Sequence, residues 1–138
     1  MQLEAQKKTL GLKIVAVLAL AHAVAGVLRA LHWFDVGSDL MGDGLLLLPF
    51  VGLVAMGWGM IVALLAGLFV VFACGALMQR SWARWLGISL AIINLLLVLS
   101  VVVQGDTPAR ALVWAIVPVV MLGYLLSAQG RRALKPYY

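Results

Sequence analysis

Residues that could bind a ligand or transfer a proton lie near the centres of three apolar segments of this 138-residue chain. His22 and Asn94 are each central in one segment, and Trp114 and Pro118 lie four residues apart in another. A polar group in hydrocarbon costs free energy unless it is paired, so we expect His22 and Asn94 to face inward and hydrogen-bond each other. Pro118 supplies no amide to the carbonyl of Trp114. The pattern predicts either an ordinary interhelical hydrogen bond with a kink, or a small polar ligand site at this depth.

His22 could also ligate a porphyrin. A b-type haem with two histidine ligands needs a second histidine at the same depth, and His32 lies ten residues further on, near the predicted outer surface. A two-histidine site within one chain is therefore not expected. A five-coordinate pigment, or a haem between two copies, needs one histidine per chain and stays open as a minor alternative. Otherwise we expect no metal site, and lipid as the only bound small molecule.

Three aspartates, Asp35, Asp39 and Asp43, are spaced four residues apart. A helix would place them on one face, but the neighbouring Gly37 and Gly42 favour a loop. The EF-hand pattern needs acidic residues two apart and a distal glutamate, and neither is present. We expect a solvated acidic loop, with weak cation binding or docking of a basic partner as lesser alternatives.

The sequence contains no familiar catalytic signature. It has no Ser-His-Asp set, no HExxH, no CxxC and no glycine-rich phosphate loop. The single cysteine, Cys74, allows no internal disulfide. The acidic residues all lie outside the apolar segments, whereas a proton-coupled transporter usually carries an intramembrane carboxylate. The missing carboxylate weighs against a proton-driven antiporter built like the small multidrug exporters, and the missing signatures predict a protein that is not an enzyme and has no catalytic residues.

Membrane-spanning helices must position these residues. The chain is 65% hydrophobic, against about 45–50% apolar residues in soluble domains. The run from Gly44 to Met78 contains no charged residue, and as a helix it would be roughly 50 Å long, well beyond the roughly 30 Å hydrocarbon core of a bilayer. The prediction is an all-α integral membrane protein whose residues 1–138 form one domain.

Four transmembrane helices are predicted, each of about the length that a bilayer requires: residues 10–31, 57–78, 85–103 and 111–128. Residues 45–56 include Pro49 and Gly52. Because Pro49 cannot donate an amide inside a helix, we expect an interfacial or re-entrant segment here, before the second helix. One long, kinked and tilted second helix is the alternative.

Basic residues predict the orientation and account for the net charge of +5. They flank the start of the first span, occupy the turn between the second and third, and follow the fourth, whereas the segment between the first and second carries aspartates alone. The positive-inside rule then places both termini in the cytoplasm, and no nucleic-acid partner is implied. The residues are Lys7, Lys8, Lys13, Arg80, Arg84, Arg131, Arg132 and Lys135.

Small residues at four-residue spacing predict where the helices approach closely. One row lies on the second span and another on the third. We expect them to pack within one compact four-helix bundle, with a dimer face as the alternative. The rows are Gly59, Ala63 and Gly67, and Ala83, Gly87 and Ala91.

The layout of the chain is similar to that of known small membrane proteins. The entry to the first span, Lys8-Thr-Leu-Gly-Leu-Lys13, its exit, Arg29-Ala-Leu-His32, and the turn Arg80-Ser-Trp-Ala-Arg84 carry the likeness. The chain resembles the DUF2127-like and DoxX-like groups of uncharacterised bacterial four-span proteins. The resemblance implies this architecture in the bacterial inner membrane, and it implies no reaction.

The sequence favours a non-enzymatic accessory or stabilising subunit of a larger membrane complex, which contacts lipid and other subunits, or copies of itself, through its helices. The second hypothesis is a small oligomeric transporter or channel that uses the level of His22, Asn94 and Pro118. The third is a pigment- or haem-binding subunit. Leucine at position 22 separates the first two, because it should abolish transport but leave assembly intact.

Overall fold

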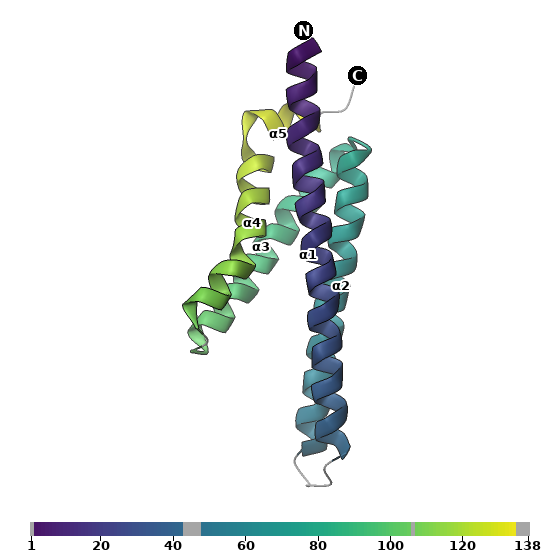
Figure 1. The fold of residues 1–138 in the computed structure, drawn as a ribbon, viewed down its shortest axis with the longest axis vertical. Helices are drawn as coiled ribbons and strands as arrows, with labels where there is room; N and C mark the ends of the chain where they lie inside the picture. The colour runs from purple at the N-terminus through teal and green to yellow at the C-terminus, as the bar shows by residue number, and fades with distance from the viewer. Residues whose placement is uncertain (1, 43–47, 106, 135–138) are drawn as a thin grey trace. The chain divides into compact units, whose positions relative to one another are not determined.

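The chain is almost entirely helical. The computed structural model describes residues 2–42, 48–105 and 107–134, and these contain no strand. The first four helices each contain a segment long and apolar enough to cross a membrane. The protein is therefore an all-helical, multi-pass membrane protein, as predicted. Its helices are α1 (Gln2–Gly42), α2 (Leu48–Leu77), α3 (Ser81–Val103), α4 (Pro108–Leu126) and α5 (Ala128–Ala133) (Figure 1).

The chain divides into two compact units. The first unit comprises residues 1–20 and 69–138, and so contains the start of α1, the end of α2 and all of α3, α4 and α5. The second unit comprises Ala21–Leu68, the remaining parts of α1 and α2.

The first helix is longer than predicted. α1 continues past Leu31 to Gly42, so Asp35 and Asp39 lie on a helix, and the prediction of an acidic loop is wrong for them. Gly37, which favoured a loop, is instead a contact point: a Cβ there would lie 2.6 Å from Cγ of Met56. Asp43 lies outside the described residues.

The second helix is also longer than predicted. α2 runs without interruption from Leu48 to Leu77, in place of a separate segment followed by a span that starts at Gly57. Pro49 fits because it stands in the first turn, where amides have no helical acceptor. Gly52 fits because a Cβ there would lie 2.7 Å from the carbonyl oxygen of Gly37. The alternative of one long second helix is what the structure contains, and residues 45–47 lie outside the described part.

The second unit is a helical hairpin whose two helices touch at small residues. Besides the Gly37–Gly52 contact, a Cβ at Gly59 would lie 3.2 Å from the carbonyl oxygen of Ala30. Further along, a Cβ at Gly26 would lie 3.1 Å from that of Ala66. Figure 1 shows these parts of α1 and α2 running side by side. Close backbone approach at three levels lets the helices pack without large interlocking side chains.

The predicted small-residue row on α2 is only partly in contact. Gly59 is buried, Ala63 is partly buried, and Gly67 is exposed with nothing within 4 Å of a Cβ built on it. Gly67 therefore has no close neighbour among the described residues of this chain, and its predicted role in helix packing or at a dimer face stays a prediction. The α1-facing side contains Gly59 and Ala66, because residues seven apart return to within about 20° on a helix. Residues eight apart, such as Gly59 and Gly67, diverge by about 80°.

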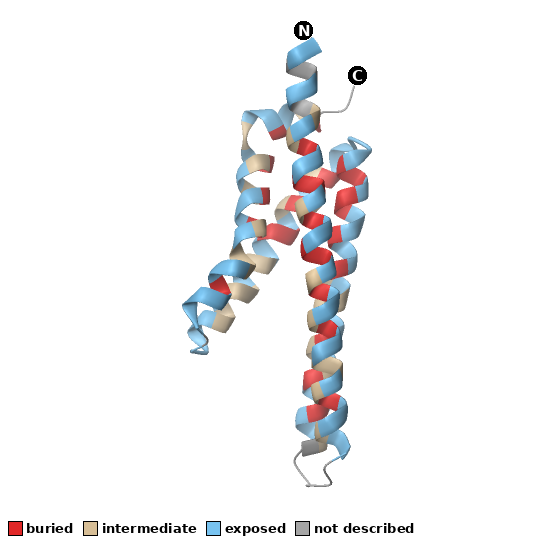
Figure 2. Ribbon diagram, viewed as in Figure 1, coloured by how far each residue is buried: buried red, intermediate tan, exposed pale blue. Residues whose placement is uncertain are grey.

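The first unit has a core in which α3 packs closely on its neighbours. The row on α3, Ala83, Gly87 and Ala91, is buried. A Cβ at Gly87 would overlap the ring of Phe72 on α2 and lie 2.6 Å from Cδ1 of Leu125 on α4, so only glycine lets these side chains meet there. Figure 2 shows such buried positions along the inner sides of the helices. The largest fully buried residues are Phe69, Phe72, Leu90, Pro118, Met121 and Leu125.

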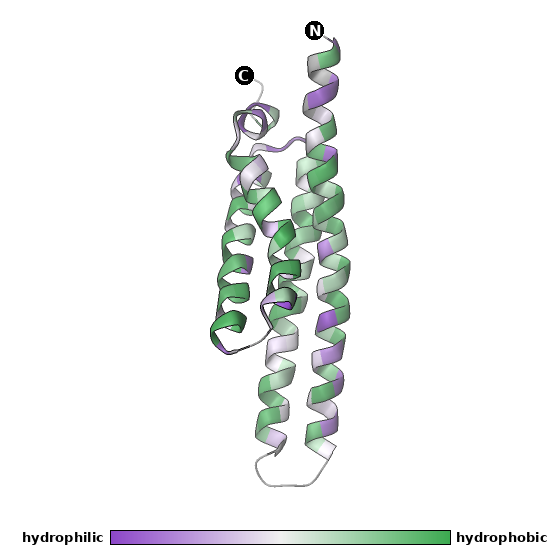
Figure 3. Ribbon diagram, turned by 60° about the vertical axis from the view of Figure 1, so that its left-hand side comes forward, coloured by the Kyte–Doolittle hydropathy of each residue, from purple (hydrophilic) through white to green (hydrophobic). Residues whose placement is uncertain are grey.

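The outward sides of the helices are strongly apolar (Figure 3). On α3 and α4, five such side chains are between 58% and 66% exposed: Leu96, Leu99, Leu112, Val113 and Ile116. Water would penalise this much apolar surface. Lipid does not, so these sides are suited to contact lipid or other transmembrane helices.

Candidate functional site

The residues predicted to form a midplane site are divided between the two units. Asn94 on α3 and Trp114 and Pro118 on α4 belong to the first unit, whereas His22 on α1 belongs to the second. His22 is 9% exposed and Pro118 is buried, while Asn94 and Trp114 are partly buried. His22, Asn94 and Trp114 each interact with another group. The direct hydrogen bond between His22 and Asn94 stays a prediction.

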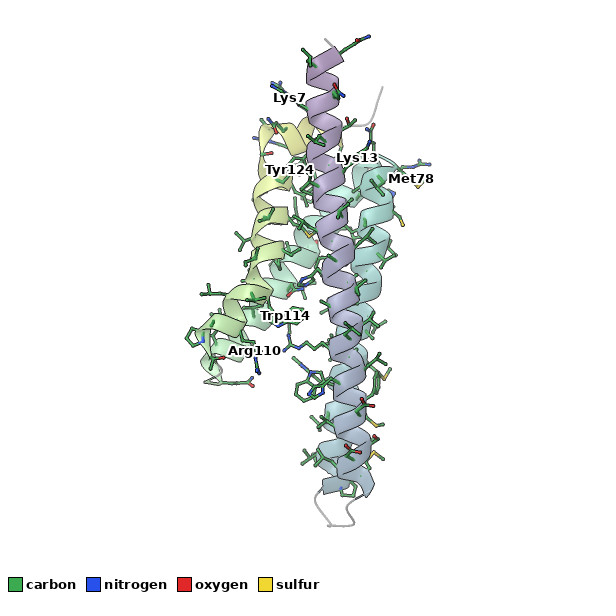
Figure 4. All side chains as sticks on the ribbon, viewed as in Figure 1. Lys7, Lys13, Met78, Arg110, Trp114 and Tyr124 are labelled. Carbon is green, nitrogen blue, oxygen red and sulfur yellow. The ribbon has the colours of Figure 1, made fainter. Side chains whose placement is uncertain are left out.

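Pro118 does not end the helix that contains it. α4 continues through it from Pro108 to Leu126, although position 118 supplies no amide to the carbonyl one turn earlier. Figure 4 places Trp114 one turn after Arg110 on the same helix. Within the described residues, no three His, Cys, Asp or Glu side chains are grouped so that they could hold a metal ion.

A second constellation surrounds the last turn of α4. Nε of Arg84, near the start of α3, donates a hydrogen bond to the carbonyl oxygen of Leu125 at 3.3 Å. The last carbonyls of a helix have no helical donor and carry the negative end of its dipole, so a cation is favourable there. The same guanidinium lies 5.7 Å from the ring centroid of Trp85, within the range of a cation–π contact.

Ser127 forms the corner between α4 and α5. Its amide donates to the carbonyls of Gly123 and Tyr124, both at 3.1 Å. Its hydroxyl donates to the Tyr124 carbonyl at 2.5 Å and accepts from the amide of Gly130 at 3.1 Å. These bonds satisfy groups at the end of one helix and the start of the next. They fix the sharp change of direction that Figure 1 shows between α4 and α5.

The short helix α5 folds back onto the end of α4. Gly130 is buried, and a Cβ there would overlap the Tyr124 carbonyl and lie 3.0 Å from Cα of Leu125. Arg131 and Arg132 follow directly and are exposed. The backbone of α5 thus carries both arginines close to the turn to which Arg84 binds.

The first helix meets the same turn from another side. A Cβ at Gly11 would lie 2.7 Å from Cε2 of Tyr124 and 3.0 Å from its hydroxyl oxygen. The exposed Lys7 and Lys13 flank Gly11 on α1. Figure 4 shows both lysines and Tyr124 at this end of the unit.

Sequence reasoning interpreted these basic residues as topology signals and missed that the segments which carry them pack around one turn of α4. One local signal was present. Ser127 is a residue type that often begins a helix, and it follows directly after the fourth apolar span. The contacts of Gly11 with Tyr124 and of Arg84 with Leu125 join segments far apart in the chain, and no local pattern reports them.

The helices define the class of the protein, a multi-pass membrane protein built almost entirely from helices. Comparison of the chain with protein-family models, curated proteins and solved structures finds no match.

Proposed function

We propose that the protein is a non-enzymatic accessory subunit that stabilises a larger membrane complex, and that it binds its partner through the end of the α1–α2 hairpin. The observation that carries this proposal is the locked extension of α1 beyond its predicted span. Gly37 of α1 and Gly52 of α2 are in close contact there, so residues 32–42 and 48–56, here called the hairpin end, form a preformed pair of helix ends.

The hairpin end reaches beyond the hydrocarbon layer. α1 has 41 residues, which correspond to about 60 Å of helix, while a bilayer core is about 30 Å thick. The part after Leu31 carries His32, Asp35, Ser38 and Asp39, which are costly to bury in lipid. These residues favour a position at or outside the membrane surface.

Two different surfaces meet at this end. Asp35 and Asp39 are exposed one turn apart on α1, whereas α2 exposes large apolar side chains, among them Phe50 at 69% and Leu53 at 59%. A partner helix that covers the apolar residues would also present its own groups to the two carboxylates. Apolar burial would supply affinity, and the charges would supply register.

The distribution of charge supports an orientation in which both termini face the cytoplasm. Eight of the ten Lys and Arg residues lie in the first part of α1, between residues 80 and 84, or after α4, whereas three of the five acidic residues lie between residues 35 and 43. By the positive-inside rule the basic end is cytoplasmic and the hairpin end faces the other side. The bacterial inner membrane remains part of the proposal, on the resemblance in layout.

Native mass spectrometry of the tagged protein, extracted in a mild detergent from its own membrane, tests this function. A foreign chain in fixed stoichiometry is the expected result. The Gly37→Leu variant should lose that chain, and Gly57→Leu should retain it, because a Cβ at Gly57 meets nothing within 4 Å. A homo-oligomer or a monomer without any foreign chain would contradict the proposal.

His22 favours one alternative function. It is the buried polar residue of α1, inside the membrane span, and such residues often mark a path for an ion or proton, or the ligand to a pigment. The alternative is a small oligomeric transporter or channel, and a coloured preparation would instead indicate bound haem or pigment. Substitution of His22 by leucine separates transport from assembly.

A further inference from the structure

We propose that the basic residues around the last turn of α4 bind the phosphate headgroup of an anionic phospholipid. The site, here called the basic cluster, consists of Lys7, Lys13, Arg84, Arg131 and Arg132. It lies within the first unit and does not depend on the docking function proposed for the hairpin end.

Three separate contacts join the segments that carry these residues to two consecutive residues of α4, Tyr124 and Leu125. Arg84 bonds to the Leu125 carbonyl. Gly11, between the two lysines, packs on the Tyr124 ring, and Gly130, just before the two arginines, packs on the Tyr124 carbonyl. Because each contact is a close approach of fixed groups, the segments that carry the five cations meet at the same end of the first unit.

Arg84 is suited to be the central ligand. Its Nε is used by Leu125 at 3.3 Å, and a guanidinium has five N–H donors, so further donors remain for a phosphate oxygen. The Leu125 carbonyl and the Trp85 ring hold the group in place, which lowers the entropy lost on binding. A planar guanidinium matches the oxygens of a phosphate in a bidentate geometry.

An open hollow beside α1 combines charge with apolar surface. Its volume is about 350 Å³, and the described residues that line it all belong to α1: Leu3, Gln6, Lys7, Thr9, Leu10 and Lys13. Two ammonium groups beside two leucines suit a molecule with a charged headgroup and hydrophobic acyl chains. A glycerophospholipid has that chemistry, whereas a free phosphate would leave the leucines uncovered.

The surroundings indicate a lipid and not a soluble anion. The exposed indoles of Trp82 and Trp85 lie at the start of α3, and tryptophan prefers the headgroup level of a bilayer. The sequence of the first unit contains nine basic residues and only Glu4 and Asp106 as acidic ones. Clusters of cations at the ends of membrane helices bind anionic headgroups in this way.

The proposal is tested on the full chain in detergent, after removal of native lipid. Phosphatidylglycerol and phosphatidylcholine with identical acyl chains are added in turn, and the bound lipid is counted by native mass spectrometry. We expect phosphatidylglycerol to be retained at least several-fold more than phosphatidylcholine, and to raise the melting temperature more. Equal retention of the two lipids would overturn the proposal.

Variants locate the site. The double variant Arg131→Gln/Arg132→Gln alters only exposed side chains and should fold, while its preference for phosphatidylglycerol should fall toward that for phosphatidylcholine. Arg84→Gln should do the same. Arg110→Gln removes one charge at the start of α4, away from the cluster (Figure 4), and should keep the preference. An equal loss in Arg110→Gln would show that only overall charge matters, and this too overturns the proposal.

Competition with inorganic phosphate distinguishes binding of a phospholipid headgroup from binding of a free phosphate ion. At millimolar concentration, inorganic phosphate should displace little phosphatidylglycerol and should not raise the melting temperature. If it displaces the lipid and stabilises the protein as well as phosphatidylglycerol does, the cluster binds a soluble anion, and the proposal of a lipid site is wrong.

Discussion

Arg84, near the start of α3, and Leu125, in the last turn of α4, are joined by a hydrogen bond of 3.3 Å from Nε to the carbonyl oxygen. The bond places a positive charge at the negative end of the α4 dipole and supplies a donor to a carbonyl that lacks a helical one. It ties together two helices that pack closely along their length, with the fully buried Leu90 on α3 and Met121 on α4. One residue thus serves both the stability of the first unit and the charge of its basic end.

Replacement of Arg84 should therefore destabilise the protein. We expect Arg84→Ala to lower the free energy of unfolding by about 1–2 kcal/mol, because a hydrogen bond from a charged group is lost and a carbonyl at the end of α4 loses its donor. The measurement is thermal unfolding in detergent, with Arg110→Ala as the control that removes an exposed arginine from the same unit. Equal melting temperatures for the two variants would show that the bond contributes nothing.

Gly87 and Gly123 form a matched pair for testing the packing of the first unit. A Cβ at Gly87 overlaps the Phe72 ring, whereas one at Gly123 meets nothing within 4 Å. Gly87→Ala should cost about 1–3 kcal/mol through overpacking. Gly123→Ala should be neutral or stabilise by up to about 1 kcal/mol, because alanine is the better helix former. Thermal unfolding of the two variants decides, and a tolerated Gly87→Ala would contradict the close packing of α3.

The membrane class and the four helices could be predicted from the sequence, because hydropathy accumulates over some twenty residues and tolerates errors at single positions. The helix ends could not. Glycine occurs both in loops and where two helix backbones approach closely, so Gly37 and Gly52 alone do not distinguish the two. The neighbouring helix does, because it shows that both glycines are at a close contact. Pro49 led to a wrong prediction for a similar reason. Proline destabilises the interior of a helix but is tolerated in its first turn, and the sequence does not show where the helix begins.

The basic end shows a different limit. An orientation in the membrane could be predicted from the basic residues, because that prediction needs only their positions relative to the apolar segments. The segments that carry them meet at Tyr124 and Leu125 through Gly11, Arg84 and Gly130, and no local period connects these three residues. The basic site can therefore be recognised only from the packing of the helices in the structure.

The hairpin end offers a prediction about rigidity and docking together. Gly37→Ala would place a Cβ within 2.9 Å of the Gly52 carbonyl oxygen, which should force α1 and α2 apart and cost about 1–3 kcal/mol. Hydrogen–deuterium exchange of the amides of residues 33–42 and 48–56 should rise. Gly57→Ala, on the open side of α2, should leave exchange unchanged, and equal exchange in the two variants would show that the glycine contact does not hold the hairpin.

Ser127 should hold α5 without controlling the rest of the fold. Ser127→Ala removes the bond to the Gly130 amide and the bond to the Tyr124 carbonyl, and loss of such a cap typically costs about 1 kcal/mol. Because α5 has only six residues, that cost should fray it locally, with faster exchange of the Gly130 and Arg131 amides. Ser127→Asp should restore much of the protection as a capping side chain, whereas unchanged exchange in Ser127→Ala would show that packing of Gly130 alone fixes the helix.

His22 decides between assembly and transport, because the two functions need different properties of the same buried side chain. His22→Leu keeps the volume and apolar fit but removes both ring nitrogens, so a subunit that acts through helix contacts should still bind its partner. His22→Gln retains hydrogen-bonding groups but cannot accept a proton near neutral pH or bind a porphyrin as imidazole does. We expect both variants to co-purify with the partner at wild-type stoichiometry. In proteoliposomes, proton and rubidium fluxes should stay at the level of protein-free vesicles for the wild type and for both variants. A wild-type flux above that level which His22→Leu abolishes would replace the accessory function by the transport alternative.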